Sequence, residues 1–262
     1  MKSIILSSLF KRVLLKNKDL LNKHNGEECY LIGNGDSIKY YNLNSFSDKI
    51  SIGCNGLDVH HDIDLLDMKY YVSTHPFLYC KYWTGEDKVF NFKKNPFFDF
   101  LSKKKHDYLS FVHISNYFSV KDKTKFRFTH SYTSKKLSNY SFDLSKPSKL
   151  SESAFDMMIG LAIYMGFKKV YLVGCDYFSI PYENGHFYEE REARAGQDFF
   201  VYQDLMDLIK DKIEIVVIGK NGYSSKIDFI TYEEFTADKE QHKHSSEIVS
   251  KKNIEMWKKA WN

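Results

Sequence analysis

Short apolar runs, each followed by polar or glycine-rich residues, recur along the chain and predict the strands of a sheet. Their length is typical of strands, and they cover 29–33, 49–54, 70–73, 169–173 and 213–218. Two other segments carry apolar residues at helical spacing, 151–165 and about 198–210, and Ser151 and Ser153 are candidate caps of the first. This alternation predicts an α/β fold, a Rossmann-like parallel sheet with right-handed crossovers and flanking helices.

The pattern outside these segments is weaker. Residues 4–22 combine lysines and arginine with apolar residues at helical spacing, which favours a helix packed on the domain over one at a membrane surface. The aromatic, lysine-rich middle, 84–148, contains the fragments Tyr108–Ile114 and Lys125–Thr129, which are candidate strands without a predicted order. The pattern therefore predicts helix 4–22 and leaves the middle of the chain unassigned.

Two parts of the chain are distinguished by composition. We expect residues 1–237 to form one nucleotide-binding domain with a lid at about 177–197. Residues 238–262 are charged and then amphipathic, with Trp257 and Trp261 four positions apart. This spacing places both rings on one helix face, so the C-terminal residues predict a docking or interfacial helix.

Polar and glycine residues follow each predicted strand, and in a parallel sheet such strand ends share one edge. They are Gly33-Asn34-Gly35, Asn55-Gly56, Thr74-His75, Gly174–Asp176 and Gly219–Gly222. Glycines let backbone N–H groups approach an anion, and asparagine amides can hold ribose hydroxyls, base edges and phosphate oxygens without a metal. Gly-Asn-Gly is also ordinary turn chemistry. Several such ends on one edge favour a nucleotide site.

Composition limits the classes of binding partner and the cellular locations that we expect. The net charge of +4 is too small to indicate a nucleic-acid-binding protein, and it fits a small anionic substrate or a lipid surface. The four cysteines, Cys29, Cys54, Cys80 and Cys175, show no zinc-ligand spacing, which predicts a reducing cytoplasm. No run approaches the roughly 18 apolar residues of a membrane-spanning helix. We expect a cytoplasmic protein, with peripheral contact to the inner membrane as a further expectation.

Four motifs together resemble a known family. They are Gly-Asn-Gly-x-Ser after the first strand, Cys-Asn at the end of the second, a serine-rich helix start, and Gly-Phe-Lys-Lys-Val-Tyr-Leu-Val-Gly-Cys-Asp-Tyr-Phe at 166–178. This order resembles the bacterial CMP-sialic-acid-dependent sialyltransferases of lipooligosaccharide. It is also similar to proteins resembling 6-hydroxymethylpterin pyrophosphokinase and to flagellin-glycosylation accessory proteins. The resemblance covers about 29–79 and 150–222, and it implies a single GT-A-like domain with a mobile lid, an inverting reaction and no metal.

The resemblance also implies roles for individual residues. The nucleotide would contact Gly33, Asn34, Gly35, Ser37, Asn55, Ser151 and Ser153. Two tyrosines of the family stabilise the departing phosphate; their positions fall on Phe178, with Tyr177 beside it, and near Tyr188. Phenol O–H groups can donate to the developing negative charge. Asp176 is expected to bind a hydroxyl or to cap the following turn.

The chain departs from the family at two positions. The general-base histidine would fall near Ala195 or Gly196, where there is no histidine, and Leu150 replaces an arginine. His186 in the lid or His75 after the third strand could supply the base, because imidazole is poised near neutral pH. Arg191 and Arg194 could bind an anionic group or form a solvated face. The sequence thus leaves two candidates for the catalytic base, His186 and His75.

Three functions remain open at this point. The first is transfer of a sugar, with a CMP-linked nonulosonic (sialic-type) acid as first choice, to a bacterial surface glycan or glycolipid of lipopolysaccharide or capsule. It needs no cofactor beyond the nucleotide sugar. The second is a magnesium-dependent pyrophosphokinase or other phosphotransferase using Asp36, Asp58 and Asp176. The third is a non-catalytic nucleotide- or glycan-binding accessory protein; for each, a homo-oligomer is an added expectation.

Overall fold

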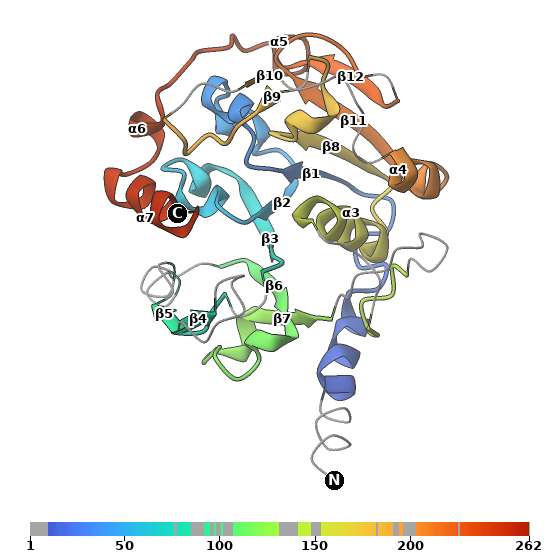
Figure 1. Cartoon of the computed structure of the whole chain (residues 1–262). Coiled ribbons are helices and arrows are strands. Elements are labelled where there is room, and N and C mark those ends of the chain that lie inside the picture. Colours follow the sequence, from blue (N-terminus) through green and yellow to red (C-terminus); the bar gives the residue numbers. More distant parts are fainter. Residues whose placement is uncertain are drawn as a thin grey trace.

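An eight-stranded, all-parallel sheet forms the centre of the computed structural model (Figure 1). The structure describes residues 10–75, 78–84, 92–94, 97, 101, 107–130, 141–147, 153–181, 183–190, 194–195, 203–224 and 226–261. The strand order is β12-β11-β8-β1-β2-β3-β6-β7. In chain order the strands are β1 (Glu28–Ile32), β2 (Ile50–Cys54), β3 (Asp67–Ser73), β6 (Leu109–His113), β7 (Phe126–Thr129), β8 (Lys169–Val173), β11 (Glu214–Gly219) and β12 (Asp228–Thr231).

Helices and two small hairpins complete the described elements. The α-helices are α3 (Ala154–Met165), α4 (Gln203–Ile209), α5 (Tyr232–Thr236), α6 (Ser245–Ile248) and α7 (Lys251–Trp261). Short 3₁₀ helices include η1 (Lys16–Leu20), η2 (Asp36–Tyr40), η3 (Leu43–Phe46), η4 (Leu57–Val59), η5 (Ile63–Leu65), η6 (Ile114–Asn116), η7 (Lys123–Lys125) and η9 (Asp176–Phe178). The pairs β4 (Tyr82–Thr84) with β5 (Phe92–Lys94) and β9 (Glu183–Asn184) with β10 (Arg194–Ala195) are antiparallel.

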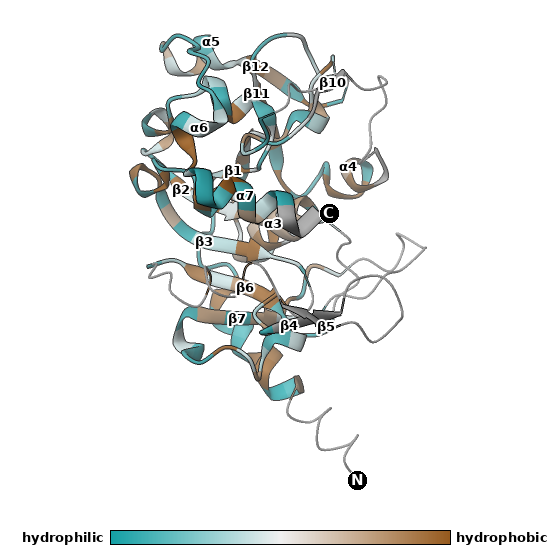
Figure 2. Ribbon diagram, turned by 60° about the vertical axis from the view of Figure 1, so that its left-hand side comes forward, coloured by the Kyte–Doolittle hydropathy of each residue, from teal (hydrophilic) through white to brown (hydrophobic). Residues whose placement is uncertain are grey.

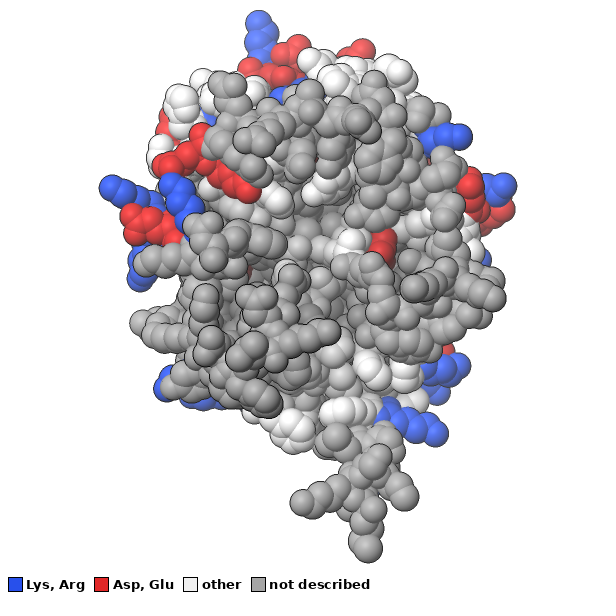
Figure 3. All heavy atoms as spheres, in the orientation of Figure 1, with Lys and Arg blue, Asp and Glu red and all other residues white. Residues whose placement is uncertain are grey.

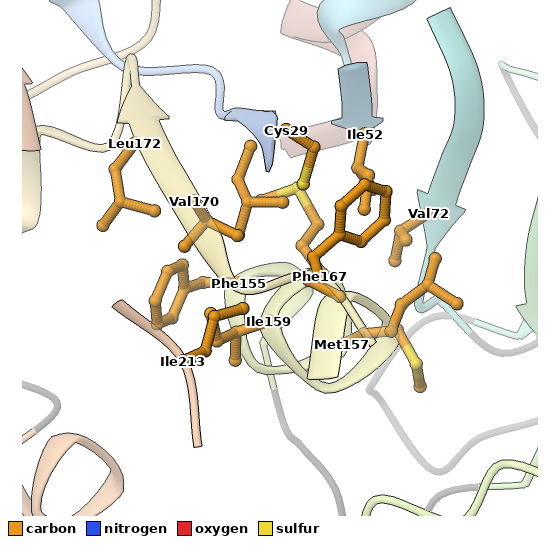
Figure 4. Close-up of a cluster of buried hydrophobic side chains, with 14 of the residues drawn as sticks. Cys29, Ile52, Val72, Phe155, Met157, Ile159, Phe167, Val170, Leu172 and Ile213 are labelled. Atoms are coloured by element: carbon orange, nitrogen blue, oxygen red, sulfur yellow. The ribbon is translucent and has the colours of Figure 1, made fainter. Parts of the chain in front are cut away.

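Both faces of the sheet are buried. Alternate strand residues point to opposite faces, so Cys29 and Leu31 of β1 join one core and Tyr30 and Ile32 the other. On the first face, Cys29, Ile52 and Val72 of three neighbouring strands point toward α3 (Figure 4). The second face is covered by the short helices after β1 and β2 and by residues of α6 and α7, which lie across the sheet from α3 (Figure 1). Two-sided burial explains the nearly continuous apolar strands, and Figure 2 shows brown, hydrophobic segments within the sheet.

The strands predicted from the sequence are all present in one parallel sheet, and the α/β class is confirmed. The two unordered fragments of the middle are β6 and β7, which extend the sheet beyond β3. Strand β12 was not predicted. Helix α3 begins at Ala154, and Ser153, one of its two candidate caps, accepts a hydrogen bond from Asp156 N–H (3.1 Å).

The N-terminal helix packs on the domain, as favoured from the sequence, over the part that the structure describes. Residues 10–15 are α-helical and continue into η1. Leu14 and Asn17 are buried, and Asn17 Nδ2 donates to the carbonyls of Phe128 (2.9 Å) and Leu144 (2.8 Å). Residues 4–9 of the predicted helix lie outside the described residues. None of the described helices is long and apolar enough to cross a membrane.

The C-terminal residues pack on the same core as the second face of the sheet. Ile248, Val249 and Ile254 are buried there, and the backbone of Val249 pairs with His60. The backbone N–H of Lys243 donates to the carbonyl of Lys39 in η2 (2.8 Å). The C-terminal segment is therefore in contact with the turns that follow β1 and β2.

Candidate active site

The turns after β1 and β8 form one hydrogen-bonded unit at the carboxyl edge of the sheet. Gly33 N–H donates to the carbonyl of Val173 and Gly35 N–H to that of Gly174, each at 2.8 Å. A side chain on Gly33 would overlap the Gly174 carbonyl oxygen. The glycines thus allow two backbones to approach closely. Because both N–H groups are engaged with the turn after β8, contact of Gly33 and Gly35 with a nucleotide stays a prediction.

Asp176 joins the same two turns through its side chain. Its Oδ1 accepts from Ser37 Oγ (2.5 Å) and its Oδ2 accepts from Ser37 N–H (3.0 Å). Both residues are buried, and a side chain on Gly35 would overlap the Asp176 carboxylate. This contact is not the expected cap of the turn that follows Asp176, because Ser37 belongs to the turn after β1. Binding of a ligand hydroxyl by Asp176 stays a prediction. Ser37 donates its hydroxyl proton to that carboxylate, so toward a ligand it can only accept.

Asn34 and Asn55 follow the neighbouring strands β1 and β2. The side-chain oxygens Asn34 Oδ1 and Asn55 Oδ1 are buried, and within the described part of the chain neither accepts a hydrogen bond. Asn55 has a positive φ of 47°, and Tyr71 Oη donates to its carbonyl (2.9 Å) while accepting from Asp58 N–H (2.8 Å). A buried amide oxygen without a partner is costly. These two amides are therefore the strongest signs of a ligand that carries hydroxyl or amine groups.

Residues 183–190 of the predicted lid, called the lid below, meet the glycine turn through their backbone. His186 forms an antiparallel bridge with Gly35, and Phe187 N–H donates to the Asn34 carbonyl (3.1 Å). The His186 side chain is 29% exposed, and its Nδ1 lies 3.5 Å from Glu189 Oε1. Its ring stacks on Tyr188, with centroids 5.0 Å apart. The structure thus brings His186 and Tyr188, both predicted site residues, to the turn after β1.

The two tyrosines differ in environment. Tyr188 is 3% exposed, and burial, followed by the nearby Glu189 carboxylate, raises the pKa of its phenol well above the ordinary value. The phenol therefore stays protonated and can donate a hydrogen bond at any physiological pH. Tyr177 is 36% exposed on η9. Phe178, at the family position of the first tyrosine, is buried against Phe155 (4.7 Å between centroids). At these two adjacent positions, Tyr177 is consequently the residue that offers an accessible phenol.

Comparison with known proteins yields matches among solved structures. No family model and no curated protein matches the sequence. The chain is similar to the sialyltransferase CstII from Campylobacter jejuni in complex with cytidine-5'-monophosphate, at 14% identity, over 90% of this chain and 98% of that chain, with a TM-score of 0.48. It is also similar to the MAf glycosyltransferase from Magnetospirillum magneticum AMB-1, at 10% identity, over 95% of this chain and 40% of that chain, with a TM-score of 0.42.

The remaining candidates lie farther from the glycine turn or outside the described residues. His75 is exposed after β3, two strands from β1, which corresponds to roughly 10 Å at the usual strand spacing. Ser153 caps α3 with its hydroxyl. Ser151 and Arg191 lie outside the described residues, and Arg194 lies in β10. His186 is thus the histidine candidate that directly adjoins the turn.

Acidic side chains at this edge have protein partners. Asp36 forms a buried ion pair with Lys39 (2.6 Å), and Asp176 accepts from Ser37. Among the described residues, no three histidine, cysteine, aspartate or glutamate side chains are placed to hold a metal ion. On the face shown in Figure 3, the described charged side chains lie mostly along the rim. The observed contacts of Asp36 and Asp176 are those of structural carboxylates.

Sequence reasoning missed Lys39. Its Nζ also donates to the carbonyl of Glu189 (2.9 Å), so this buried cation links η2 to the lid. The only local signal was an aspartate three residues earlier, at the spacing of a helical ion pair. A contact with a residue 150 positions away has no signature in the sequence.

The His60 ring contacts Phe187 of the lid, and its titration makes the stability of the protein depend on pH. The ring is 3% exposed, 5.5 Å from Phe187 between centroids, and its Nδ1 accepts from Asp62 N–H (3.0 Å). Burial, aided by Lys243 and His61, lowers the pKa of His60 to about 4, while Asp62 opposes the shift. From pH 6.5 down to about 4 the unfolded chain gains a proton that the folded protein does not take up. Stability therefore decreases across this interval.

We expect His60→Gln to remove this contribution, which amounts to about 3 kcal/mol over the interval. The measurement is the free energy of unfolding by urea from pH 4 to 7 in both proteins. The exposed neighbour provides the matched substitution, His61→Gln. An equal pH slope in the wild type and in His60→Gln would contradict the assignment.

Proposed function

We propose that the protein is a glycosyltransferase that takes its sugar from a nucleotide donor. The observation that carries the proposal is the pair of buried amide oxygens, Asn34 Oδ1 and Asn55 Oδ1, at adjacent strand ends beside a lid with a histidine and a protonated tyrosine. Ribose hydroxyls and an exocyclic amine of a base are donors that suit these oxygens. A CMP-linked nonulosonic acid is the first choice of donor, supported by the motif resemblance.

The chemistry follows from the polar groups of the lid. His186 accepts the proton of the acceptor hydroxyl while that oxygen attacks the anomeric carbon from the side opposite the phosphate. The bond from the anomeric carbon to the phosphate oxygen breaks, and its electron pair leaves with the nucleotide. Tyr188 and Tyr177 donate hydrogen bonds to the charge that develops on that oxygen. One displacement of this kind inverts the anomeric configuration, and a bacterial surface glycan at the inner membrane is the proposed acceptor.

A nucleotide panel tests the donor. Thermal-shift and calorimetric titrations with CMP, UDP, GDP and ATP, each with and without EDTA, should show stabilisation by CMP that does not depend on metal. Mass spectrometry should then detect transfer or slow hydrolysis of CMP-activated sugars. Binding without turnover would identify the accessory protein, and magnesium-dependent use of ATP would identify the phosphotransferase. Either result would overturn the proposal.

Asn55→Gly provides a sharp test of the amide. Glycine tolerates the positive φ of 47° at this position, so the change removes the side chain without backbone strain. Loss of one buried hydrogen bond to the nucleotide should weaken binding about tenfold or more. The free energy of unfolding should stay within about 0.5 kcal/mol of the wild type, because Asn55 Oδ1 has no protein partner among the described residues. Unchanged nucleotide affinity by calorimetry would exclude Asn55 from the site.

A further inference from the structure

The lid tyrosine stacks on one ring of its own segment and on one ring of the distant helix α7. Tyr188 stacks on Trp257 of α7, with centroids 4.6 Å apart and planes 19° apart, and on His186 at 5.0 Å and 27°. Tyr188 therefore has stacking partners both in the lid and in α7. The second neighbour of Trp257 is Phe97, at 4.6 Å. Stacked rings restrict the orientation of the phenol.

Gly56 lets both rings approach the end of β2. A Cβ atom on Gly56 would lie 2.7 Å from Tyr188 Cε1 and 2.8 Å from Trp257 Cζ2, which is closer than side-chain carbons pack. Gly56 directly follows Asn55, the residue with the buried, unpartnered amide oxygen. The contact therefore places the Tyr188–Trp257 pair directly beside the candidate nucleotide site.

Three consecutive lid residues contact the C-terminal segment. Besides the Tyr188–Trp257 stack, the carbonyl of Glu189 accepts from Ser245 Oγ (2.6 Å), and Glu190 pairs with Lys258 Nζ (2.6 Å). Figure 1 shows α6 and α7 side by side near the end of the chain. Through these three contacts the lid and the C-terminal helices pack together at the candidate site.

We propose that Trp257 is a positioning residue, which holds the Tyr188 phenol at the orientation needed to donate to the departing phosphate. The inference rests on the proposed function only for that last role; the coupling of α7 to the lid is independent of any donor. Tyr188 lies outside the helices and strands of the lid, so side-chain contacts set its orientation. Trp257 acts through Tyr188 and has no chemical role of its own.

A double-mutant cycle separates positioning from general stability. Trp257→Ala should lower kcat about 10- to 100-fold, the scale of a small misplacement of a catalytic group, with a smaller change in KM for the donor. Trp257→Phe keeps an aromatic face and should recover most of the activity. Tyr188→Phe removes the hydroxyl, and in that background Trp257→Ala should have little further effect on kcat. A full additional loss in the Tyr188→Phe background would overturn the proposal.

Hydrogen exchange of the ligand-free protein gives a second readout. In Trp257→Ala, amides of 183–190 should exchange at least about tenfold faster, while those of β8 stay unchanged. Lys258→Ala is the matched control on the same helix, since it removes only the exposed pair with Glu190 and should change exchange far less. If the alanine variant does not fold, Trp257→Leu replaces it, because leucine is apolar without an aromatic face.

The two readouts distinguish the two proposals. Unchanged lid exchange in a folded Trp257→Ala or Trp257→Leu protein would overturn the role of Trp257. Absence of transfer by the wild-type protein with every donor would overturn the proposed function, and the exchange measurement would still decide whether α7 holds the lid.

Discussion

Replacing His186 with alanine should lower the rate of sugar transfer about 10²- to 10⁴-fold, the usual contribution of a general base. His186 pairs with Gly35 through its backbone, which the substitution leaves in place. Nucleotide affinity should therefore stay within about threefold of the wild type. Single-turnover transfer from a CMP-activated sugar measures the rate, and calorimetry with CMP measures the affinity.

A parallel substitution of His75 tests which of the two candidate histidines is the catalytic base. His75 is exposed after β3 and lies about two strand spacings from β1. His75→Ala should change the rate much less than His186→Ala. If instead His75→Ala abolishes transfer and His186→Ala does not, the base belongs to His75 and the lid histidine only packs on Tyr188. His186→Gln preserves a polar side chain without a basic nitrogen, and it should remain as slow as the alanine variant.

The sheet was predictable where each strand carries its own signal. β1 and β8 are short apolar runs that end in glycine, and two-sided burial demands that composition. β6 and β7 could not be ordered, because their place in the sheet beyond β3 depends on contacts between distant residues. One such contact is the amide of Asn17, whose two carbonyl partners lie at Phe128 and Leu144. An edge strand such as β7, with Arg127 in its middle, lacks the pattern of a central strand.

The position of the candidate site was predictable for the same reason, since polar strand ends share an edge in any parallel sheet. The contacts within it were not. Gly35 is glycine because Asp176, 141 positions later, occupies the space of a side chain. Trp257 was expected to lie on a docking or interfacial helix. Helical spacing could not predict that its ring stacks on Tyr188. Such pairings depend on tertiary packing, which a single sequence does not reveal.

Replacing Asp176 with alanine should lower the free energy of unfolding by about 3–5 kcal/mol, because two hydrogen bonds to a charged, buried acceptor are lost together. Ser37 N–H and Ser37 Oγ each donate to a different carboxylate oxygen, at 3.0 and 2.5 Å. Ser37 is 3% exposed and Asp176 8%, so water cannot readily replace the acceptor. Urea unfolding followed by circular dichroism measures the change.

Two milder variants separate the structural contact between Asp176 and Ser37 from a ligand contact. Ser37→Ala removes only the hydroxyl bond and should cost less than Asp176→Ala, whereas Asp176→Asn keeps one acceptor oxygen and should fall between the wild type and Asp176→Ala. The double variant Ser37→Ala with Asp176→Ala should be less destabilised than the sum of the two, because the residues share one interaction. If Asp176 mainly bound a sugar hydroxyl, Asp176→Ala would weaken nucleotide-sugar binding while leaving unfolding within about 0.5 kcal/mol of the wild type. That outcome would show that Asp176 binds the ligand rather than stabilising the two turns.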